Sequence, residues 1–249
     1  MTEKLSSRQS GVIRRIRELS RDGAARRKES VFLCDGEKLL QEALRSGAEP
    51  VCVLWKGQRL PGYPDFTEEY LLSDELYDYV SPMKNSPGPL FTVRLPEENP
   101  VSELRSAIVL EGVQDPGNVG TVLRTADAFG VDAVILLEGC ADCYAPKTVR
   151  AGMGAVFRQR VLHMDRTEVA GYCHAAGLRL YGAALTDKAA DLRTVPLGRT
   201  AVAIGSEGRG LSRELLACCD GELIIPMSGE AESLNAAVAA AIVMWEMRR

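Results

Sequence analysis

The sequence predicts an α/β protein whose larger part is a parallel sheet flanked by helices. Two observations lead to this fold class. Strand-like and helix-like segments alternate strictly after residue 105, and glycine-punctuated turns follow several of the strand-like segments. Such alternation is typical of parallel sheets, which bind ligands at the carboxyl ends of their strands. The 249 residues, 46% hydrophobic and 26% charged, suit one large or two modest globular domains.

Residues 1–29 are predicted to form a basic arm. Residues 1–30 contain nine Lys/Arg and four acidic residues, so they carry +5 while the remainder carries −9. Apolar residues recur at helical spacing among the arginines, which predicts an amphipathic helix over about 9–21. This asymmetry keeps a nucleic-acid partner open although the whole chain carries −4. We expect Arg14, Arg15 and Arg17 to contact RNA; a solvated helix surface is the alternative.

Residues 30–95 are predicted to form a small α/β unit. Strands are expected around 31–34, 51–55 and 89–95, with a helix after the first strand and a turn-rich stretch from 56 to 70. Ser73 is the expected cap of a short second helix. The polar, proline-punctuated stretch that follows makes 96–105 the expected linker to a domain spanning 106–249.

The alternating segments of the second domain follow one another without an internal repeat. The expected strands are 107–111, 133–137, 159–163, 179–184, 201–205 and 222–225. The expected helices are 118–129, about 146–152, 166–176, 211–217 and 233–247, with Asn118 as the cap of the first.

The sequence also argues against several classes of protein. It has no stretch of about 18 apolar residues and no apolar core of a signal peptide near its start, so a cytoplasmic protein without a membrane anchor is expected. The seven cysteines are an odd set, and Cys140–Cys143 is a lone CxxC pair without matching ligands, so no metal is expected.

Three glycine-containing segments carry the candidate chemistry of the second domain. They are Asn118-x-Gly120-x-x-x-Arg124-x-Ala126, then Gly205-x-Glu207-Gly208-x-Gly210-Leu211, then Ile225-Pro226-Met227 followed by Ser233-Leu234-Asn235. None of them is a GxGxxG fingerprint or a P-loop, which argues against a nucleotide-binding oxidoreductase.

In this order, the three segments resemble the motifs of the SpoU (TrmH-type) RNA ribose 2′-O-methyltransferases of the SPOUT superfamily, over about residues 106–249. The resemblance implies a C-terminal trefoil knot that holds S-adenosylmethionine, and a homodimer packed through helices such as the last one. Residues 30–95 resemble, more loosely, the attached RNA-binding domain with a fold similar to a ribosomal protein.

The resemblance also implies roles for single residues. Gly205, Ile225, Met227 and Leu234 would line the S-adenosylmethionine pocket. Arg124 matches the catalytic arginine; because an arginine stays protonated, we expect it to clamp phosphate and to stabilise the developing alkoxide. Asn118 would orient Arg124 or the ribose, and Glu207 would hold Arg124 or Asn118 in place.

Ser233 and Asn235, at the start of the last helix, complete the implied catalytic set through contacts with substrate or with neighbouring site groups. The expected activity is S-adenosylmethionine-dependent methylation of a ribose 2′-hydroxyl, with ribosomal RNA favoured as substrate. A transfer RNA enzyme, or a non-catalytic RNA-binding protein that retains the knot, is the alternative.

Overall fold

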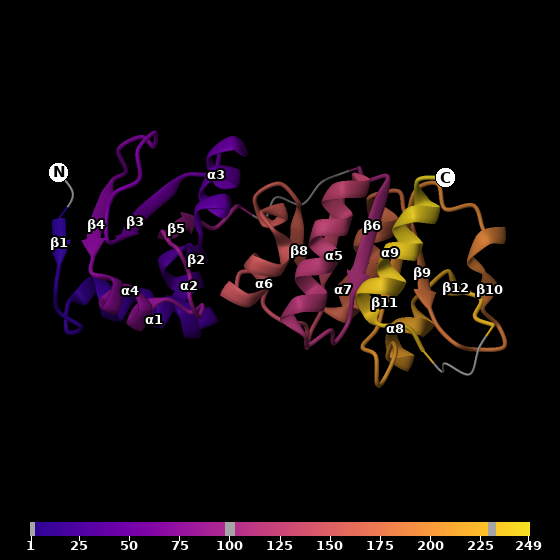
Figure 1. Cartoon of the computed structure of the whole chain (residues 1–249). Coiled ribbons are helices and arrows are strands. Elements are labelled where there is room, and N and C mark those ends of the chain that lie inside the picture. The colour runs from indigo at the N-terminus through magenta and orange to yellow at the C-terminus, as the bar shows by residue number, and fades with distance from the viewer. Residues whose placement is uncertain (1–2, 98–102, 229–232) are drawn as a thin grey trace. The chain divides into compact units, whose positions relative to one another are not determined.

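A computed structural model describes residues 3–97, 103–228 and 233–249 (Figure 1). The chain forms two compact units. Unit 1 contains residues 1–97 and 142–157, and unit 2 contains residues 98–141 and 158–249. The polypeptide therefore passes between the units three times.

Unit 1 is built on a five-stranded mixed sheet with the order β1-β4-β3-β5-β2. The strands are β1 (Glu3–Leu5), β2 (Val31–Asp35), β3 (Pro50–Lys56), β4 (Glu68–Leu72) and β5 (Leu90–Arg94). β5 is antiparallel to both β2 and β3, whereas β4 is parallel to β3 and β1. Two of these strands were not predicted, because β1 has only three residues and β4 lies at the end of the turn-rich stretch.

The helices of unit 1 include two that form the basic arm. They are α1 (Gly11–Arg21), α2 (Gly23–Glu29), α3 (Glu37–Arg45), α4 (Asp74–Val80), α6 (Pro146–Gly152) and the 3-10 turn η1 (Ala155–Phe157). α1 has the predicted amphipathic pattern, and its residues Ile13, Ile16 and Leu19 are fully buried in the core of unit 1. Burial of three such side chains contributes roughly 5–9 kcal/mol before the entropic cost of ordering them. The arm is therefore part of unit 1 and not a separate segment. Ser73 caps α4 as predicted, through a bond from Leu76 N–H.

Residues 142–157 were predicted within the second domain, but their contacts place them in unit 1. The buried Arg26 of α2 forms an ion pair with Asp142 at 2.6 Å. The ring of Phe32 in β2 lies 5.1 Å from that of Tyr144 and 5.9 Å from that of Phe157. The helix itself was predicted correctly, because local periodicity reports a helix but not the core on which it packs.

Unit 2 is a seven-stranded parallel sheet with the order β10-β12-β9-β11-β6-β7-β8. The strands are β6 (Ser106–Leu110), β7 (Ala133–Leu136), β8 (Val161–His163), β9 (Arg179–Ala183), β10 (Ala190–Asp191), β11 (Thr200–Ile204) and β12 (Gly221–Ile224). All six predicted strands are present, which confirms the α/β class with a parallel sheet. The two-residue β10 was not predicted, and residues 98–102 of the predicted linker 96–105 lie outside the described residues.

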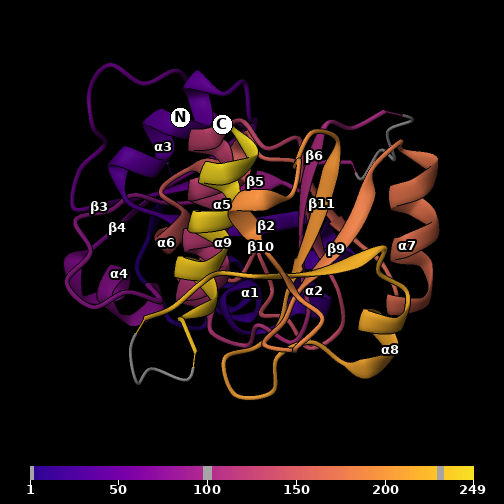
Figure 2. The ribbon, with the colours of Figure 1, turned by 90° about the vertical axis from the view of Figure 1, so that its right-hand side faces the viewer.

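Helices cover both faces of this sheet. They are α5 (Pro116–Phe129), α7 (Arg166–Ala175), α8 (Arg213–Ala217) and α9 (Ala236–Met247), with a 3-10 turn η2 (Leu192–Thr194). α5 and α9 pack together on one face, and α7 and α8 lie on the other (Figure 2). The central strands β6, β7 and β11 are almost wholly buried, as expected for strands covered on both sides. No helix in the described ranges is long and apolar enough to cross a membrane.

Candidate active site

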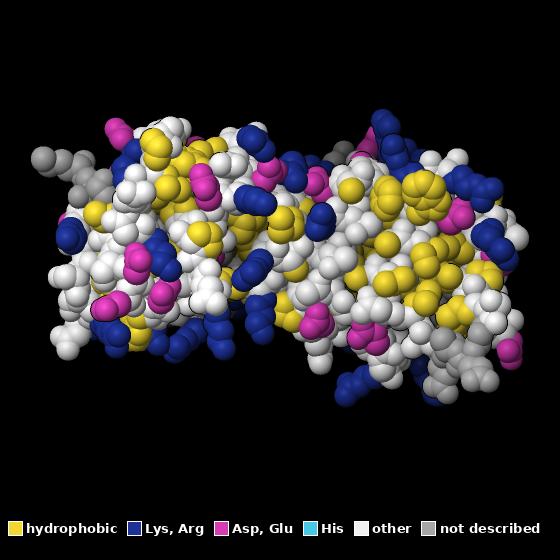
Figure 3. Space-filling view, viewed as in Figure 1, with side chains coloured by type: hydrophobic (Ala, Val, Ile, Leu, Met, Phe, Trp, Pro, Cys, Tyr) yellow, Lys and Arg dark blue, Asp and Glu magenta, His cyan; other side chains and the backbone are white. Residues whose placement is uncertain are grey.

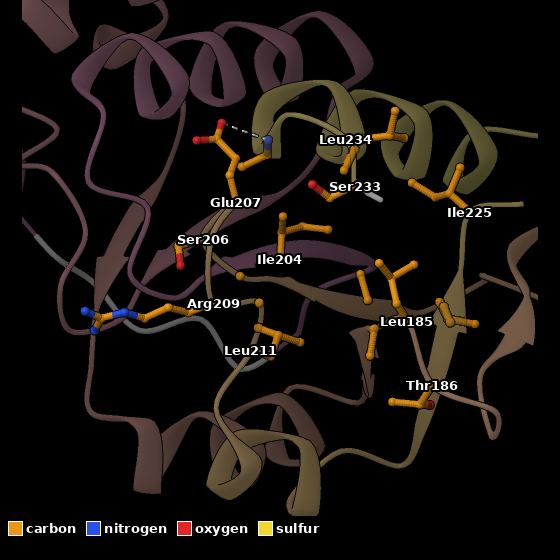
Figure 4. A pocket seen from close by; sticks show the side chains of 18 of the residues that line it. Leu185, Thr186, Ile204, Ser206, Glu207, Arg209, Leu211, Ile225, Ser233 and Leu234 are labelled. Carbon is orange, nitrogen blue, oxygen red and sulfur yellow. Dashed lines mark hydrogen bonds between the residues drawn. The ribbon is translucent and has the colours of Figure 1, made fainter. Parts of the chain in front are cut away.

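A cavity of about 440 Å³ opens at the carboxyl ends of β9, β11 and β12 in unit 2 (Figure 4). Its walls are largely apolar and include Leu185, Ile204 and Leu211, whereas Ser206 and Glu207 contribute polar groups. This is the edge at which a parallel sheet is expected to bind ligands. The volume and the mixture of apolar walls with a few polar groups suit a small organic ligand.

All four residues predicted to bind the cofactor line this cavity. Gly205 lies at the end of β11, Ile225 and Met227 follow β12, and Leu234 precedes α9. Two sequence segments about 20 residues apart thus enclose one space, as the motifs implied. The alignment of Ile225 and Leu234 toward the same space is visible in Figure 4.

Gly205 is required by the loop itself. A Cβ atom at this position would lie 2.1 Å from the carbonyl carbon of Gly210 and 2.4 Å from the nitrogen of Leu211. The loop turns back on itself here, since Gly210 N–H donates to Ser206 O at 2.8 Å and Gly210 has a φ of +66°. Close backbone packing therefore explains why a glycine is needed at position 205.

A cluster of hydrogen bonds joins the three predicted motifs beside the cavity. Glu207 Oε1 accepts from Asn118 Nδ2 at 2.7 Å and from Asn235 Nδ2 at 2.6 Å. Asn235 Nδ2 also donates to Asn118 Oδ1 at 3.1 Å. The backbone N–H of Ala236 donates to Glu207 Oε1 at 3.3 Å, the bond drawn in Figure 4. We call Asn118, Glu207 and Asn235 the amide–carboxylate cluster.

Two helices begin at this cluster, and one of its asparagines caps its helix whereas the other does not. Asn235 caps α9, and its Oδ1 accepts from Ala237 N–H and Val238 N–H. Asn118 was predicted to cap α5, but Asp115 does so by accepting from Asn118 N–H at 2.9 Å. The helix begins at Pro116, whose fixed φ favours the first helical position, so Asn118 lies inside the first turn. Its side chain is thereby free to bond Glu207.

Arg124 stands apart from the cavity and from the cluster. It lies on the exposed side of α5 and does not line the cavity. Its side chain makes no hydrogen bond or ion pair within the described parts of the chain. Glu207 therefore holds Asn118 and not Arg124, which resolves the two partners that the sequence left open for Glu207. Ser233 lines the cavity without belonging to the cluster (Figure 4).

Glu111, which the sequence analysis did not single out, fastens the far end of the glycine-containing loop. Its buried carboxylate accepts from Ser212 N–H and from the Ser212 hydroxyl, each at 2.7 Å, and forms an ion pair with Arg166 at 2.7 Å. Ser212 in turn caps α8. An acid directly after a buried strand was the signal in the sequence. Leu185 and Thr186 were missed as well, although they follow the predicted strand 179–184 and therefore lie at the same edge.

The three arginines predicted to contact RNA have different surroundings in unit 1. Arg15 forms ion pairs with Glu29 at 2.6 Å and with Glu68 at 3.3 Å. The guanidinium of Arg17 stacks 4.2 Å from the ring centre of Tyr79 and donates to its hydroxyl. Arg14 is exposed, and its side chain has no hydrogen-bond or ion-pair partner among the described residues.

The lone CxxC pair has the character of structural thiols. Cys140 donates to Leu110 O at 3.2 Å, and burial raises its pKa, so the thiol stays protonated. Cys143 is buried. In residues 3–97, 103–228 and 233–249, no group of three or more His, Cys, Asp or Glu side chains is arranged to hold a metal ion.

Comparison with known proteins places this site in a family. The model of the SpoU rRNA Methylase family matches residues 105–245. The 23S rRNA (guanosine(2553)-2′-O)-methyltransferase RlmP of Bacillus subtilis is 36% identical over 226 residues, which cover 90% of each chain.

Two solved structures resemble almost the whole chain. The S-adenosylmethionine-bound rRNA methyltransferase from Sinorhizobium meliloti has a TM-score of 0.87 at 25% identity, covering 99% of this chain and 97% of that one. The SpoU methyltransferase AviRb from Streptomyces viridochromogenes, in complex with S-adenosylmethionine, has a TM-score of 0.87 at 27% identity, with 96% and 97% covered. With its cavity at the carboxyl edge of a parallel sheet and its three motifs joined through Glu207, the chain belongs to the SpoU rRNA methylase family.

Proposed function

We propose that the protein transfers a methyl group from S-adenosylmethionine to a ribose 2′-hydroxyl of ribosomal RNA. The observation that carries this proposal is the cavity lined by Gly205, Ile225 and Leu234 next to the amide–carboxylate cluster. The relatives support the substrate, since RlmP is a 23S rRNA 2′-O-methyltransferase, and two similar structures hold S-adenosylmethionine. With such a substrate, we propose that the reaction takes place in the cytoplasm.

The cavity fits S-adenosylmethionine in both size and chemistry. Ile225, Leu234 and Leu211 offer apolar surface for an adenine ring, and the backbone of the loop from 205 to 210 offers polar groups for the rest of the molecule. Bound there, the cofactor supplies an electrophilic methyl group.

The protein's own groups would orient and activate the ribose. Asn118 is fixed by Glu207 at one end and by Asn235 at the other, so its position needs no rearrangement when RNA binds. The guanidinium of Arg124 has no side-chain partner among the described residues, so it is available to bind a phosphate or a developing alkoxide. We therefore retain Arg124 as the residue that stabilises negative charge, and Asn118, Glu207, Ser233 and Asn235 as the residues that position the ribose.

We further propose that the C-terminal segment is threaded into a trefoil knot around this cavity. The support is that Met227 and Leu234 line the same cavity as the loop from 205 to 211, although this loop precedes both of them in the chain. α9 then packs against α5 and β11, in the middle of the sheet, although it is the last element.

A separate proposal concerns residues 30–95, which we propose to have a ribosomal-protein-like fold that binds RNA.

A homodimer packed through α9 and α5 is the proposed assembly. Trp245 is 63% exposed and Val238 is 47% exposed, both on α9. Figure 3 shows hydrophobic side chains gathered over α9. Large apolar side chains that share one exposed face are typical of an interface between chains. Light scattering of the protein and of a Trp245→Glu variant tests this, because monomer mass in both would contradict it.

Methyl transfer from labelled S-adenosylmethionine to protein-free ribosomal RNA tests the main proposal. We expect incorporation with ribosomal RNA, a much lower level with transfer RNA, and a loss of at least about 100-fold in Arg124→Ala, equal to about 2.7 kcal/mol of transition-state stabilisation. Arg213→Ala, at an exposed arginine of α8, is the control. Cofactor binding without transfer to either RNA would indicate a non-catalytic RNA-binding protein. Faster transfer to transfer RNA would replace ribosomal RNA as the substrate.

A further inference from the structure

The amino edge of the unit 2 sheet carries a row of charged residues. Five neighbouring strands, in the order β9, β11, β6, β7 and β8, each have a charged residue at or immediately before their first position. In that order the residues are Arg179, Arg199, Arg105, Asp132 and Arg160. Thr200 pairs with both Ser106 and Arg179, and Ala107 pairs with Ala133, so these positions lie side by side.

Two adjoining hollows of 300 and 400 Å³ lie along this row. Both are lined by Arg105, Asp132 and Arg199. Arg160 borders the first hollow, and Arg248, at the end of α9, borders the second. Figure 3 shows Lys and Arg side chains gathered above the start of β6 and the end of α9.

Part of this charge is used within the fold. Arg199, which has a φ of +54°, donates to Gly177 O at 3.1 Å and to Ala176 O at 3.4 Å, so it caps the end of α7. The carboxylate of Asp132 accepts from the backbone N–H of Arg105 at 2.6 Å and of Ser106 at 3.0 Å. These two residues hold the edge together.

Arg179 donates to Pro196 O at 2.9 Å, and the other three arginines, which line the hollows, have no such task. Arg105, Arg160 and Arg248 are exposed, and none forms a hydrogen bond or ion pair through its side chain with a residue in the described ranges. Glu103, on the rim of the first hollow, is the second acid of the site, so the six charged residues that line the two hollows leave a balance of +2. Unit 2 as a whole is acidic, with 13 Lys/Arg and 18 Asp/Glu. The dipole at the C-terminal end of α7 accounts for the positive charge of Arg199. The three guanidinium groups of Arg105, Arg160 and Arg248 remain unpaired among the described residues.

We propose that this edge, which we call the arginine edge, binds phosphodiester groups of the RNA substrate. Guanidinium groups match phosphate oxygens in geometry and charge, and three of them converge on hollows large enough to admit a phosphate. The arginine edge lies at the opposite end of the sheet from the cofactor cavity, about 20 Å away along β11. It is therefore a second contact that holds the RNA without touching the reacting ribose. The inference rests on the proposed RNA substrate.

The salt dependence of RNA binding tests the arginine edge. Each lost phosphate contact lowers the slope of log K against log [salt] by about 0.7–0.9, because fewer counterions are released. For the triple variant R105Q/R160Q/R248Q with protein-free ribosomal RNA, we expect the slope to fall by about two and the affinity at low salt to fall at least tenfold. The melting temperature and the affinity for S-adenosylmethionine should not change, because none of the three side chains lines the cavity or bonds to the fold.

The matched control is Arg193→Gln, which also removes one positive charge from unit 2, but at an arginine that is already paired with Asp191 at 2.5 Å. A triple variant with the slope of the wild type, or with no larger change than three times that of Arg193→Gln, overturns the inference. If the triple variant gives that result while the wild type methylates ribosomal RNA, the proposed function stands and only the inference about the arginine edge fails. A wild type that neither binds nor methylates ribosomal RNA overturns both.

Discussion

The carboxylate of Glu207 accepts a hydrogen bond from the side-chain amide of Asn118 at 2.7 Å, although 89 residues separate the two in the chain. The same oxygen accepts from Asn235 and from Ala236 N–H, so one atom gathers the first, second and third motifs of the family. A carboxylate that accepts several bonds holds its partners more firmly than a neutral group would.

Glu207→Gln should impair catalysis more than folding. The substitution keeps the shape and one acceptor oxygen but removes the charge, so the bonds from Asn118 and Asn235 change from charge-assisted to neutral ones and weaken. We expect kcat/KM for methyl transfer to fall about 10- to 100-fold, corresponding to hydrogen bonds worth about 1.5–3 kcal/mol. Glu168→Gln, an exposed glutamate of α7, is the control. Equal rates in the two variants would show that the cluster does not position the substrate.

Gly205→Ala should damage the cavity through a backbone clash. The new methyl group would overlap the main chain at Gly210 and Leu211, which cannot move aside as a flexible side chain could. We expect a loss of about 1–3 kcal/mol in unfolding free energy and a weaker affinity for S-adenosylmethionine by calorimetry. Gly208→Ala in the same loop is the matched control, since a Cβ there has nothing within 4 Å. Unchanged cofactor affinity in Gly205→Ala would contradict the assigned cavity.

Arg26→Met should destabilise unit 1 by about 3 kcal/mol, because it leaves Asp142 without its ion-pair partner. Arg26 Nη1 also donates to Leu19 O at 2.5 Å, a bond that is lost as well. Denaturation of Arg26→Met, Asp142→Asn and the double variant should show a coupling energy of at least about 1 kcal/mol. Arg27→Met, at the exposed neighbour, should change stability by less than about 0.5 kcal/mol. Additive effects of the two single variants would disprove the coupling.

The thiol of Cys173 should make stability fall above pH 9. Burial raises its pKa from an ordinary value near 9.0 to about 12, so the folded state keeps the proton while the unfolded state releases it. The stabilising contribution is complete below pH 9 and is lost progressively as the pH rises toward 12. Urea denaturation at pH 8 and pH 10 should show a loss for the wild type that is about 1 kcal/mol larger than for Cys173→Ala. An identical pH dependence would mean that this thiol titrates normally.

Arg14→Gln should weaken RNA binding, whereas Arg15→Gln should lower the stability of the protein. Arg14 is exposed and unpaired among the described residues, so its loss should reduce the salt slope of RNA binding by nearly one and leave the melting temperature unchanged. Arg15 is held by Glu29 and Glu68, and its loss should cost up to about 1 kcal/mol of stability. If both variants bind RNA like the wild type, the arm serves only to fold unit 1.

Much of the fold could be predicted from periodicity and motif order. The elements and contacts that were not predicted have identifiable physical causes. The strands of unit 2 are continuous apolar runs because both faces are covered, so all six were predicted, whereas β1 and β10 are too short to show a pattern. Gly205, Ile225, Met227 and Leu234, which line the cavity, were named through the resemblance of the three motifs to the family. The partner of Glu207 depends on side-chain distances across 89 residues, which no local pattern encodes. The cap of α5 was mistaken locally, because Asp115, three residues before Asn118, caps the helix.

The return of residues 142–157 to unit 1 has a consequence for synthesis on the ribosome. The N-terminal 97 residues contain a complete sheet, but the aromatic partners of Phe32 and the counterion of Arg26 are translated only with residues 142–157. At 5–20 residues per second, the synthesis of the 60 residues from 98 to 157 takes roughly 3–12 s, during which these partners are incomplete. Unit 1 therefore cannot finish folding as an early, independent module, and a fragment ending at residue 97 should expose apolar surface that the full chain covers.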